Sequence, residues 1–179
     1  MASLPRFRLH ATNLLVSLVA PWGVFHASQA DTAPQPTLQL PFDGTTDGIR
    51  SDGKTVAPLE THGTPTFRAG KVGQAFLTGG DEAWLEYPGD ALDPQQGSVM
   101  LWVCPLNWSS SDDKFHVFLE AGEEKYGQGW FLLYKYYQSA WLLFRLKDER
   151  NGVTMPFKPV IWKPGEWHHV VATWQLGRQ

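Results

Sequence analysis

Cysteine is almost absent from this chain, since Cys104 is its single example, and an intrachain disulfide is therefore excluded. A lone thiol within an apolar segment behaves as a small hydrophobic side chain. We therefore interpret Cys104 as a buried core residue. Without disulfides the fold depends on its hydrophobic core, and 179 residues that are 42% hydrophobic suffice for one domain of this kind.

Excess positive charge and long apolar runs are also lacking. The formal net charge is −3, so the chain shows no basic footprint for nucleic acid. The apolar run at 14–25, LLVSLVAPWGVF, is only about twelve residues long and is interrupted by Pro21 and Gly23, whereas a helix needs about twenty apolar residues to cross a bilayer. The sequence therefore predicts neither a nucleic-acid partner nor a membrane span.

The same short run has the features of an export signal. Arg6, Arg8 and His10 precede it, and the small-residue sequence Ser-Gln-Ala at 28–30 follows it. An uncleaved anchor or a poorly ordered tail is the alternative. A cleaved signal predicts a location that is secreted, periplasmic or at the cell surface. The predicted organisation is a signal peptide at 1–30, a Pro-containing linker at 31–37 and one folded domain at 38–179.

Aromatic residues are plentiful, at 13% of the chain and with nine Trp. Gly and Pro recur every eight to twelve residues or so and divide the chain into short runs rich in Val, Leu and aromatics, a spacing typical of an all-β sandwich. No stretch shows a helical stripe of apolar residues. The predicted strands are 38–42, 65–69, 74–78, 83–87, 97–106, 115–121, 130–136, 141–147, 153–159 and 167–174.

The run GSVMLWVCPL at 97–106 is apolar at both odd and even positions. Side chains alternate between the two faces of a strand. Both faces of this strand therefore carry apolar side chains, and we expect a central strand that is covered on both sides.

Three stretches together are similar to one known family. They are AGKVGQAF at 69–76, GSVMLWVCPL at 97–106 and GEWHHVVATW at 165–174. In this order and spacing they resemble a laminin G-like domain of the concanavalin A-like lectin/glucanase superfamily, over about residues 38–176. The resemblance implies a jelly roll, that is, a sandwich of two packed antiparallel sheets, one of them concave.

The resemblance also implies that further strands follow the one that ends near Trp174. Members of the family usually carry a hairpin partner after it, with a pattern similar to Leu-Tyr-Val-Asp-Gly, and no such pattern follows here. The sequence therefore suggests an interior strand in a jelly roll that is incomplete at its C-terminus. The expected partner is the set of missing strands in the full-length chain, because an unfinished sheet exposes a hydrogen-bonding edge and an apolar face.

Paired carboxylates of the glucanase type are not evident. Relatives with that activity carry a signature similar to Glu-x-Asp-x-x-Glu, which places its acids on one face of a strand. The acidic stretches around Glu86, Glu120 and Glu149 lack this spacing. We therefore predict no catalytic residue and no enzymatic activity.

Metal sites receive little support from the spacing of ligand residues. Asp43, Asp47 and Asp52 are each followed by Gly, so calcium is possible, with Asp43 as the candidate, but Asp-Gly is foremost a turn dipeptide. His168 and His169 are adjacent on a predicted strand and therefore point to opposite faces, so they cannot bind one metal ion. His116 has no Cys or acidic residue at a spacing typical of metal ligands. We predict no other cofactor, and we interpret the charged run DDK at 112–114 as solvated loop surface.

The segment WFLLYKYYQSAWLLFRLK at 130–147 offers the best candidate for ligand contact. We expect a hairpin in which Tyr134, Tyr136, Trp141 and Arg145 face a ligand, because sugars stack on aromatic rings and polar side chains bind their hydroxyls. The alternative is that these rings fill the core. The predicted function is a non-catalytic, carbohydrate-binding module of a longer exported protein. The alternative function is a structural or interaction domain that presents a catalytic or adhesive neighbour and binds no small ligand.

Overall fold

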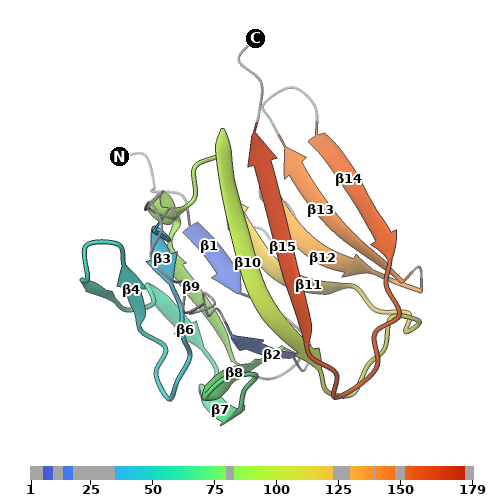
Figure 1. Ribbon diagram of the computed structural model, residues 1–179, viewed down its shortest axis with the longest axis horizontal. Helices are drawn as coiled ribbons and strands as arrows, with labels where there is room; N and C mark the ends of the chain where they lie inside the picture. Colours follow the sequence, from blue (N-terminus) through green and yellow to red (C-terminus); the bar gives the residue numbers. More distant parts are fainter. Residues whose placement is uncertain are drawn as a thin grey trace, which may run out of the picture.

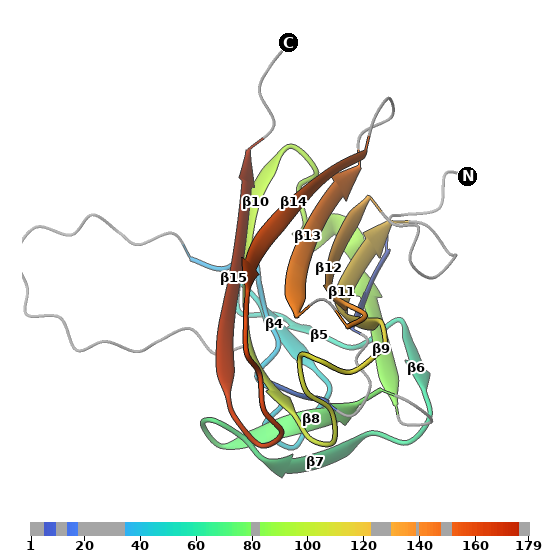
Figure 2. The ribbon, with the colours of Figure 1, turned by 90° about the vertical axis from the view of Figure 1, so that its right-hand side faces the viewer.

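The chain forms two layers of antiparallel strands, which Figure 2 shows from the side and Figure 1 from the front. This computed structural model describes the residues 6–9, 14–17, 35–79, 83–122, 130–138, 140–147 and 152–175. For 14–17 and 152–158 it describes the backbone alone. An all-β sandwich was predicted, and the arrangement confirms it.

The large sheet contains seven strands within the described residues, and each pairs antiparallel with its neighbour. Their order differs from the order in the chain, because the N-terminal strand lies between two later ones. The strands run β14 (Gly152–Pro159), β13 (Trp141–Lys147), β12 (Phe131–Tyr136), β11 (His116–Gly122), β1 (Arg6–Leu9), β9 (Trp84–Pro88) and β6 (Glu60–His62).

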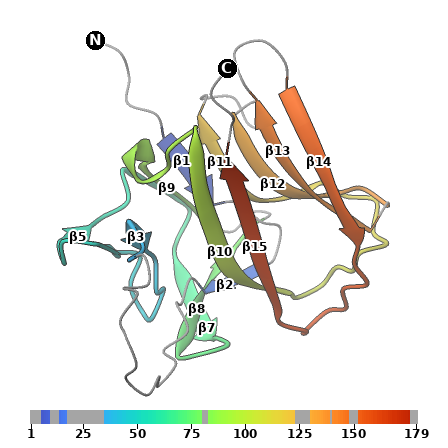
Figure 3. The ribbon, with the colours of Figure 1, turned by 45° about the horizontal axis from the view of Figure 1, so that its top comes forward.

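The small sheet contains five described strands and faces the large one. In order they are β15 (His168–Gln175), β10 (Gln96–Pro105), β2 (Leu14–Ser17), β8 (Gln74–Thr78) and β7 (Thr66–Ala69). The strands β3 (Leu38–Gln39), β4 (Gly48–Arg50) and β5 (Thr55–Val56) form a third sheet beside the sandwich (Figure 3), and a 3-10 turn spans Gly89–Ala91.

The core lies between the two sheets and takes alternate residues from each strand. In β15 the side chains of Val170, Ala172 and Trp174 are buried, and the residues between them are exposed. The same cluster includes Leu101 and Val103 of β10, together with residues of the large sheet. This period of two is what a strand covered on one face requires. In the described part of the chain no helix has the length and apolar character needed to cross a membrane.

Gly97, the second residue of β10, lies where only a residue without a side chain fits. It lies directly opposite Trp174 in the register of β10 and β15. A Cβ atom at Gly97 would be 2.5 Å from the indole ring. The indole covers the backbone here, and its Nε1 donates a hydrogen bond of 2.9 Å to the carbonyl of Asp93.

All ten predicted strands are present, and 74–78 and 141–147 have the predicted bounds. The hairpin interpretation of 130–147 is confirmed by the pairing of β12 with β13. The sequence prediction missed β1, β2, β4, β5 and β6. Each of these has four residues or fewer, which gives a weak pattern, and β1 and β2 lie in the segment interpreted as a signal peptide.

The expectation for β10 was correct in one respect and wrong in another. β10 is central, with β15 on one side and β2 on the other. Its outer face is not covered along its whole length, since Ser98 and Met100 are exposed. The outer face of β10 becomes covered near Cys104, which is buried beside Ala75 and Leu77. The interpretation of Cys104 as a buried core residue is therefore confirmed.

Two strands lie within the segment predicted to be a signal peptide. β1 pairs with β9 and β11 in the large sheet, and β2 pairs with β10 and β8 in the small one. Phe7 and Leu9 are buried in the core. Residues 6–9 and 14–17 are therefore part of the two layers, and removal of the segment as an export signal would take an interior strand from each sheet.

Candidate functional site

The four predicted ligand residues share one face of the hairpin β12–β13. Tyr136 lies opposite Trp141, and Tyr134 lies opposite Leu143. Arg145 is two residues beyond Leu143, so alternation places it on this face as well. Phe131 and Leu133 alternate with these residues and join the core. We call the face that is turned away from the small sheet the outer face.

Aromatic rings gather at the end of the hairpin on this outer face. The ring centroids of Phe115 and Tyr134 are 4.8 Å apart, and those of Tyr136 and Tyr137 are also 4.8 Å apart, edge to face. Phe115 lies 5.9 Å from Tyr137 and so joins the two pairs. Tyr136 is 46% exposed and Trp141 is 43% exposed. We call this group the ring cluster: Phe115, Tyr134, Tyr136, Tyr137 and Trp141.

Tyr134 differs from the other predicted ligand residues because it is buried. It packs with Val117, Leu132 and Leu143 in a second apolar cluster, separate from the core between the sheets. Burial raises the pKa of its hydroxyl, and the positive charge of Arg145 opposes this shift in part. Tyr134 therefore supports the exposed rings of the ring cluster. The expected alternative, that rings of this segment fill a core, describes Tyr134 well.

A row of polar residues crosses the outer face of the large sheet. The pairing register places Glu86 of β9 opposite Arg8 of β1, and Arg8 opposite Glu120 of β11. The row contains, from β6 to β13, Glu60, Glu86, Arg8, Glu120, Leu132 and Arg145, so one apolar residue interrupts it before Arg145. Charged groups from strands far apart in the sequence therefore lie in line with Arg145.

Glu86 is the most buried acid in this row, with a side-chain exposure of 0%. Its Oε1 accepts a hydrogen bond of 2.9 Å from Arg6 Nη1, and its Oε2 accepts one of 2.9 Å from Arg8 Nε. Burial acts to raise the pKa of Glu86, but the bonds from the two guanidinium groups outweigh it, and the pKa is lowered. Glu86 is thus held as a carboxylate, which suits an ion pair and not a general acid.

Sequence reasoning missed this row because it looked for acids along single strands. Glu86 and Glu120 belong to strands that both flank β1, and Arg8 lies between them. The guanidinium of Arg8 also lies 5.4 Å from the ring centroid of Trp84, which stacks on His62 at 3.5 Å. The signal was present as alternation of Arg with apolar residues in Arg-Phe-Arg-Leu, but it was assigned to an export signal.

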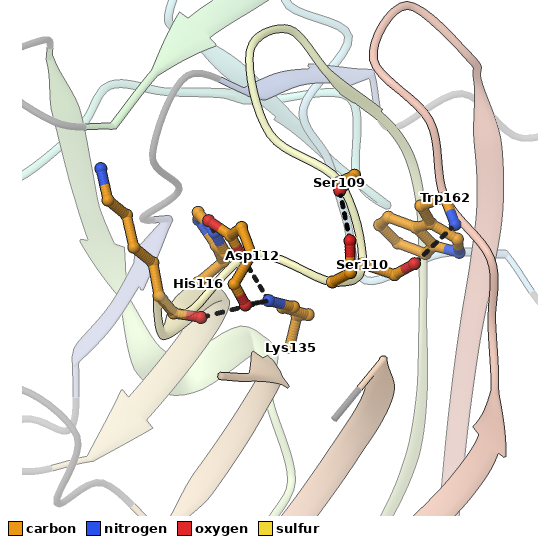
Figure 4. A network of polar contacts seen from close by, with 8 residues as sticks. Ser109, Ser110, Asp112, His116, Lys135 and Trp162 are labelled. Atoms are coloured by element: carbon orange, nitrogen blue, oxygen red, sulfur yellow. Dashed lines mark hydrogen bonds and ion pairs between the residues drawn. The ribbon is translucent and has the colours of Figure 1, made fainter. Parts of the chain in front are cut away.

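A second polar network lies where the β10–β11 loop meets β11 and β12, and Figure 4 shows it. Asp112 is its centre. Lys135 Nζ donates to Asp112 Oδ1 and, at 2.6 Å, to the backbone carbonyl of the same residue. His116 Nε2 donates to Asp112 Oδ2 at 2.8 Å, since an ionised carboxylate can only accept. His116 and Lys135 are register partners, so the two strands present both donors to one loop residue.

His116 is fully buried and lies between polar and aromatic neighbours. Its ring stacks on Trp108 at 4.1 Å, and Trp108 in turn stacks on Trp162 at 6.0 Å. The bond to Asp112 uses Nε2, which leaves the buried Nδ1 as an acceptor with no protein hydrogen bond. Burial lowers the pKa of His116, and the neighbouring Asp112 opposes this shift only in part. The ring is therefore neutral at neutral pH.

The interpretation of the run at 112–114 as solvated surface is correct for Asp113 and Lys114, which are exposed, and wrong for Asp112, which is bound by Lys135 and His116. No partner for His116 was predicted from the sequence, although Asp112 precedes it by four residues. Desolvation acts to raise the pKa of Asp112, and the bonds from Lys135 and His116 lower it overall. With Lys135 and His116 both buried, the network anchors the loop to the sheet.

The candidate calcium ligand takes part in a turn. Asp43 Oδ1 accepts a 3.0 Å hydrogen bond from the backbone N–H of Gln74, beside Gly73, which has a positive φ of 56°. Asp52 likewise accepts from the backbone N–H of Lys54 at 3.0 Å. Over the described ranges, no three His, Cys, Asp or Glu residues group in a way that could hold a metal ion.

The neighbours His168 and His169 point to opposite faces of β15, as expected from alternation. His168 stacks on Trp162 at 4.4 Å, and burial lowers its pKa. His169 is exposed and stacks on Trp102 at 4.8 Å. The two rings therefore contribute to different surroundings and cannot bind a single ion.

Comparison with known proteins yields no match: no family model, no curated protein and no solved structure is similar to this chain. Only the geometry of the molecule itself therefore indicates a function. Two features of the large sheet are relevant. They are the ring cluster, which is partly exposed, and the row of charged residues that leads to Arg145 on the same face.

Proposed function

We propose that this chain is a non-catalytic binding module, related to laminin G-like domains, and that it binds carbohydrate at the ring cluster. The observation that supports the proposal is the exposure of Tyr136, Tyr137 and Trp141 at one end of the outer face. Single exposed rings are common on protein surfaces. Exposure of three large rings to water at one hairpin is unfavourable, and a bound ligand would cover part of this apolar surface.

Chemistry favours a sugar as the ligand. The C–H faces of a pyranose are apolar and pack on aromatic rings, and its hydroxyls need donors and acceptors around them. The ring cluster offers the first surface, and the hydroxyls of Tyr136 and Tyr137 extend it. Arg145 lies two strand positions beyond Leu143 on the same face and can donate several hydrogen bonds. A sugar with an acidic substituent would fit such a guanidinium best.

The rest of the hairpin holds these rings in place. Tyr134 is buried below them, and Phe115, the residue before β11, contacts three tyrosines. A platform whose rings are already packed loses little side-chain entropy when a ligand binds. This rigidity favours recognition of a sugar face over induced fit.

A glycan array with the full chain tests the proposal. Reproducible binding to a defined group of glycans is expected for the wild-type chain. Tyr136→Ala and Trp141→Ala should each weaken that binding by about tenfold or more, which corresponds to about 1.4 kcal/mol. Tyr136→Phe keeps the ring and should retain most of the affinity.

A matched control removes an exposed apolar side chain elsewhere. Ile161 is 82% exposed and lies in the segment before β15. Ile161→Ala should leave glycan binding unchanged. Unaltered binding in the Tyr136→Ala and Trp141→Ala variants would contradict the proposed site, and no binding to any glycan would contradict the proposed ligand class.

The second candidate function is an interaction domain without a small ligand. The observation that favours it is an apolar pair on the outside of the small sheet, where Met100 of β10 lies opposite Val171 of β15 and both are exposed. A neighbouring domain could cover this pair. A silent glycan array, together with retained folding, would support this candidate over the first.

A further inference from the structure

β1 has the place of an inserted strand. All four residues of Arg6–Leu9 have register partners on both sides, in β9 and in β11. Among the described residues β9 and β11 do not pair with each other, so β1 joins the two parts of the large sheet. The main chain of this short segment therefore closes a gap in the middle of the sheet.

The inward side chains of β1 complete the core. Phe7 stacks on Tyr87 with 5.3 Å between the ring centroids, and Leu9 is almost fully buried. Tyr87 is fully buried too, and its hydroxyl donates to the carbonyl of Thr46 at 2.5 Å. An occupant of this gap therefore needs apolar residues at alternate positions, two residues apart.

The outward side chains of β1 satisfy a buried acid. Arg8 and Arg6 bind the two oxygens of Glu86, whose side chain is inaccessible to solvent. Arg8 is itself largely buried, and Arg6 is 44% exposed. A buried carboxylate that loses its cations is strongly unfavourable. The same occupant therefore needs basic residues at the positions that alternate with the apolar ones.

We propose that the gap between β9 and β11 is a strand-acceptor site, specific for an extended strand with the pattern Arg-apolar-Arg-apolar, and that residues 6–9 of this chain are its occupant. Pairing of the main chain supplies affinity, and the alternate side chains supply specificity, as in other modes of strand addition. Glu86 selects the basic residues, and the space beside Tyr87 selects the apolar ones.

The occupant of this site can be exchanged, because β1 is attached to the sheet through only four residues. A strand of the same pattern from outside can therefore enter once the chain's own strand is weakened. The proposal is independent of carbohydrate binding, since the ring cluster lies at the hairpin β12–β13 and shares no residue with the gap.

The test uses the full chain with Arg6→Glu and Arg8→Glu, in which the strand of the chain itself is repelled by Glu86. The probe is a fluorescent peptide of residues 5–10, with the sequence PRFRLH. We expect the variant to bind this peptide at least about tenfold more tightly than the wild-type chain, whose site is filled. A peptide with Gln at both Arg positions should bind at least about tenfold more weakly, because it lacks the charge-assisted bonds to Glu86.

The control is Arg68→Glu, a charge reversal at an exposed position of β7, which should behave as the wild type. If the double variant does not fold, the PRFRLH peptide added during refolding should restore soluble protein and the Gln peptide should not. The proposal is overturned if the double variant keeps the wild-type unfolding midpoint and binds no peptide. It is also overturned if both peptides bind or rescue equally well.

Discussion

The large sheet contains two buried ionic clusters that are built in opposite ways. In the first, Asp112 is bound by His116 and Lys135, which lie 4 and 23 residues further along the chain. In the second, Glu86 is bound by Arg6 and Arg8, which lie 80 and 78 residues earlier. In both clusters burial acts to raise the pKa of the carboxylate, and the hydrogen bonds from the neighbouring groups lower it overall.

The difference lies in what each cluster needs in order to form. The Asp112 cluster needs one loop and the adjacent strands β11 and β12, so a single stretch of chain contains all of it. The Glu86 cluster needs β1 to enter between β9 and β11, at the cost of closing a long loop. We infer that the first cluster anchors local structure and that the second reports whether the N-terminal strand is docked.

The largest expected effect is the loss of Lys135. Its ammonium group is buried and binds both the side chain and the backbone carbonyl of Asp112. Lys135→Met removes the cation and leaves the acid with His116 alone, so we expect the free energy of unfolding to fall by about 3 kcal/mol. Chemical denaturation measures this. Lys163→Met, at a 70% exposed lysine, should change it by less than about 0.5 kcal/mol.

Glu86→Gln should have a smaller effect, of about 1.5 to 3 kcal/mol, because Gln keeps an acceptor for Arg8 while the charge is lost. The matched control is Glu60→Gln. Glu60 is the register partner of Glu86 but is half exposed. If the two variants are equally stable in chemical denaturation, β1 is not docked against Glu86 in solution.

The two clusters should also respond to pH in different ranges. Burial lowers the pKa of His116, so the unfolded chain takes up a proton before the folded one does. The stabilisation is complete above the ordinary His pKa of about 6.5 and is lost as pH falls through the lowered value. The pKa values of Asp112 and Glu86 are lowered too, and their contribution is lost only as pH falls below about 4.

The variant His116→Gln separates the pH range of His116 from that of the two carboxylates, because Gln does not titrate. We expect the fall in unfolding free energy between pH 7 and pH 5 to become smaller in this variant, with the remainder due to His168, whose pKa burial also lowers. Glu86→Gln should leave the slope in this range unchanged. An unaltered slope in His116→Gln would show that His116 is accessible to protons in the folded state.

The smallest expected effect on stability belongs to the exposed rings. Tyr136→Ala removes a side chain that is 46% exposed and belongs to neither ionic cluster. We therefore expect the free energy of unfolding to fall by about 1 kcal/mol or less. Thermal unfolding measures it. A much larger loss would show that the ring cluster is a structural unit, and a fall in glycan binding could then not be assigned to ligand contact.

Prediction from the sequence succeeded where the pattern is local. The strand at 74–78 and the hairpin strand at 141–147 were predicted with the bounds that the structure has. Side-chain alternation also placed Tyr134, Tyr136, Trp141 and Arg145 together on one face. These features depend only on the period of a strand and on the turn residues beside it.

Prediction did less well where the feature depends on contacts between distant segments. Asp112 looked like part of a charged loop, and only the packing of that loop against β12 gives it Lys135 as a partner. Arg6 and Arg8 were considered only as part of a predicted export signal, and their ion pairs with Glu86 follow from the place of β1 beside β9. The sequence shows that a charge is present but not how deeply the fold will bury it.

The amino-acid sequence by itself determined the ten predicted strands and the all-β sandwich class, because alternation and turn chemistry act within a few residues. Tertiary structure alone decided the order of strands within each sheet, the insertion of β1 and β2, and the partners of the buried charges. The physical reason is that sheet pairing and burial are set by which segments meet. Bringing distant segments together costs loop-closure entropy, and burial of the whole core offsets this cost.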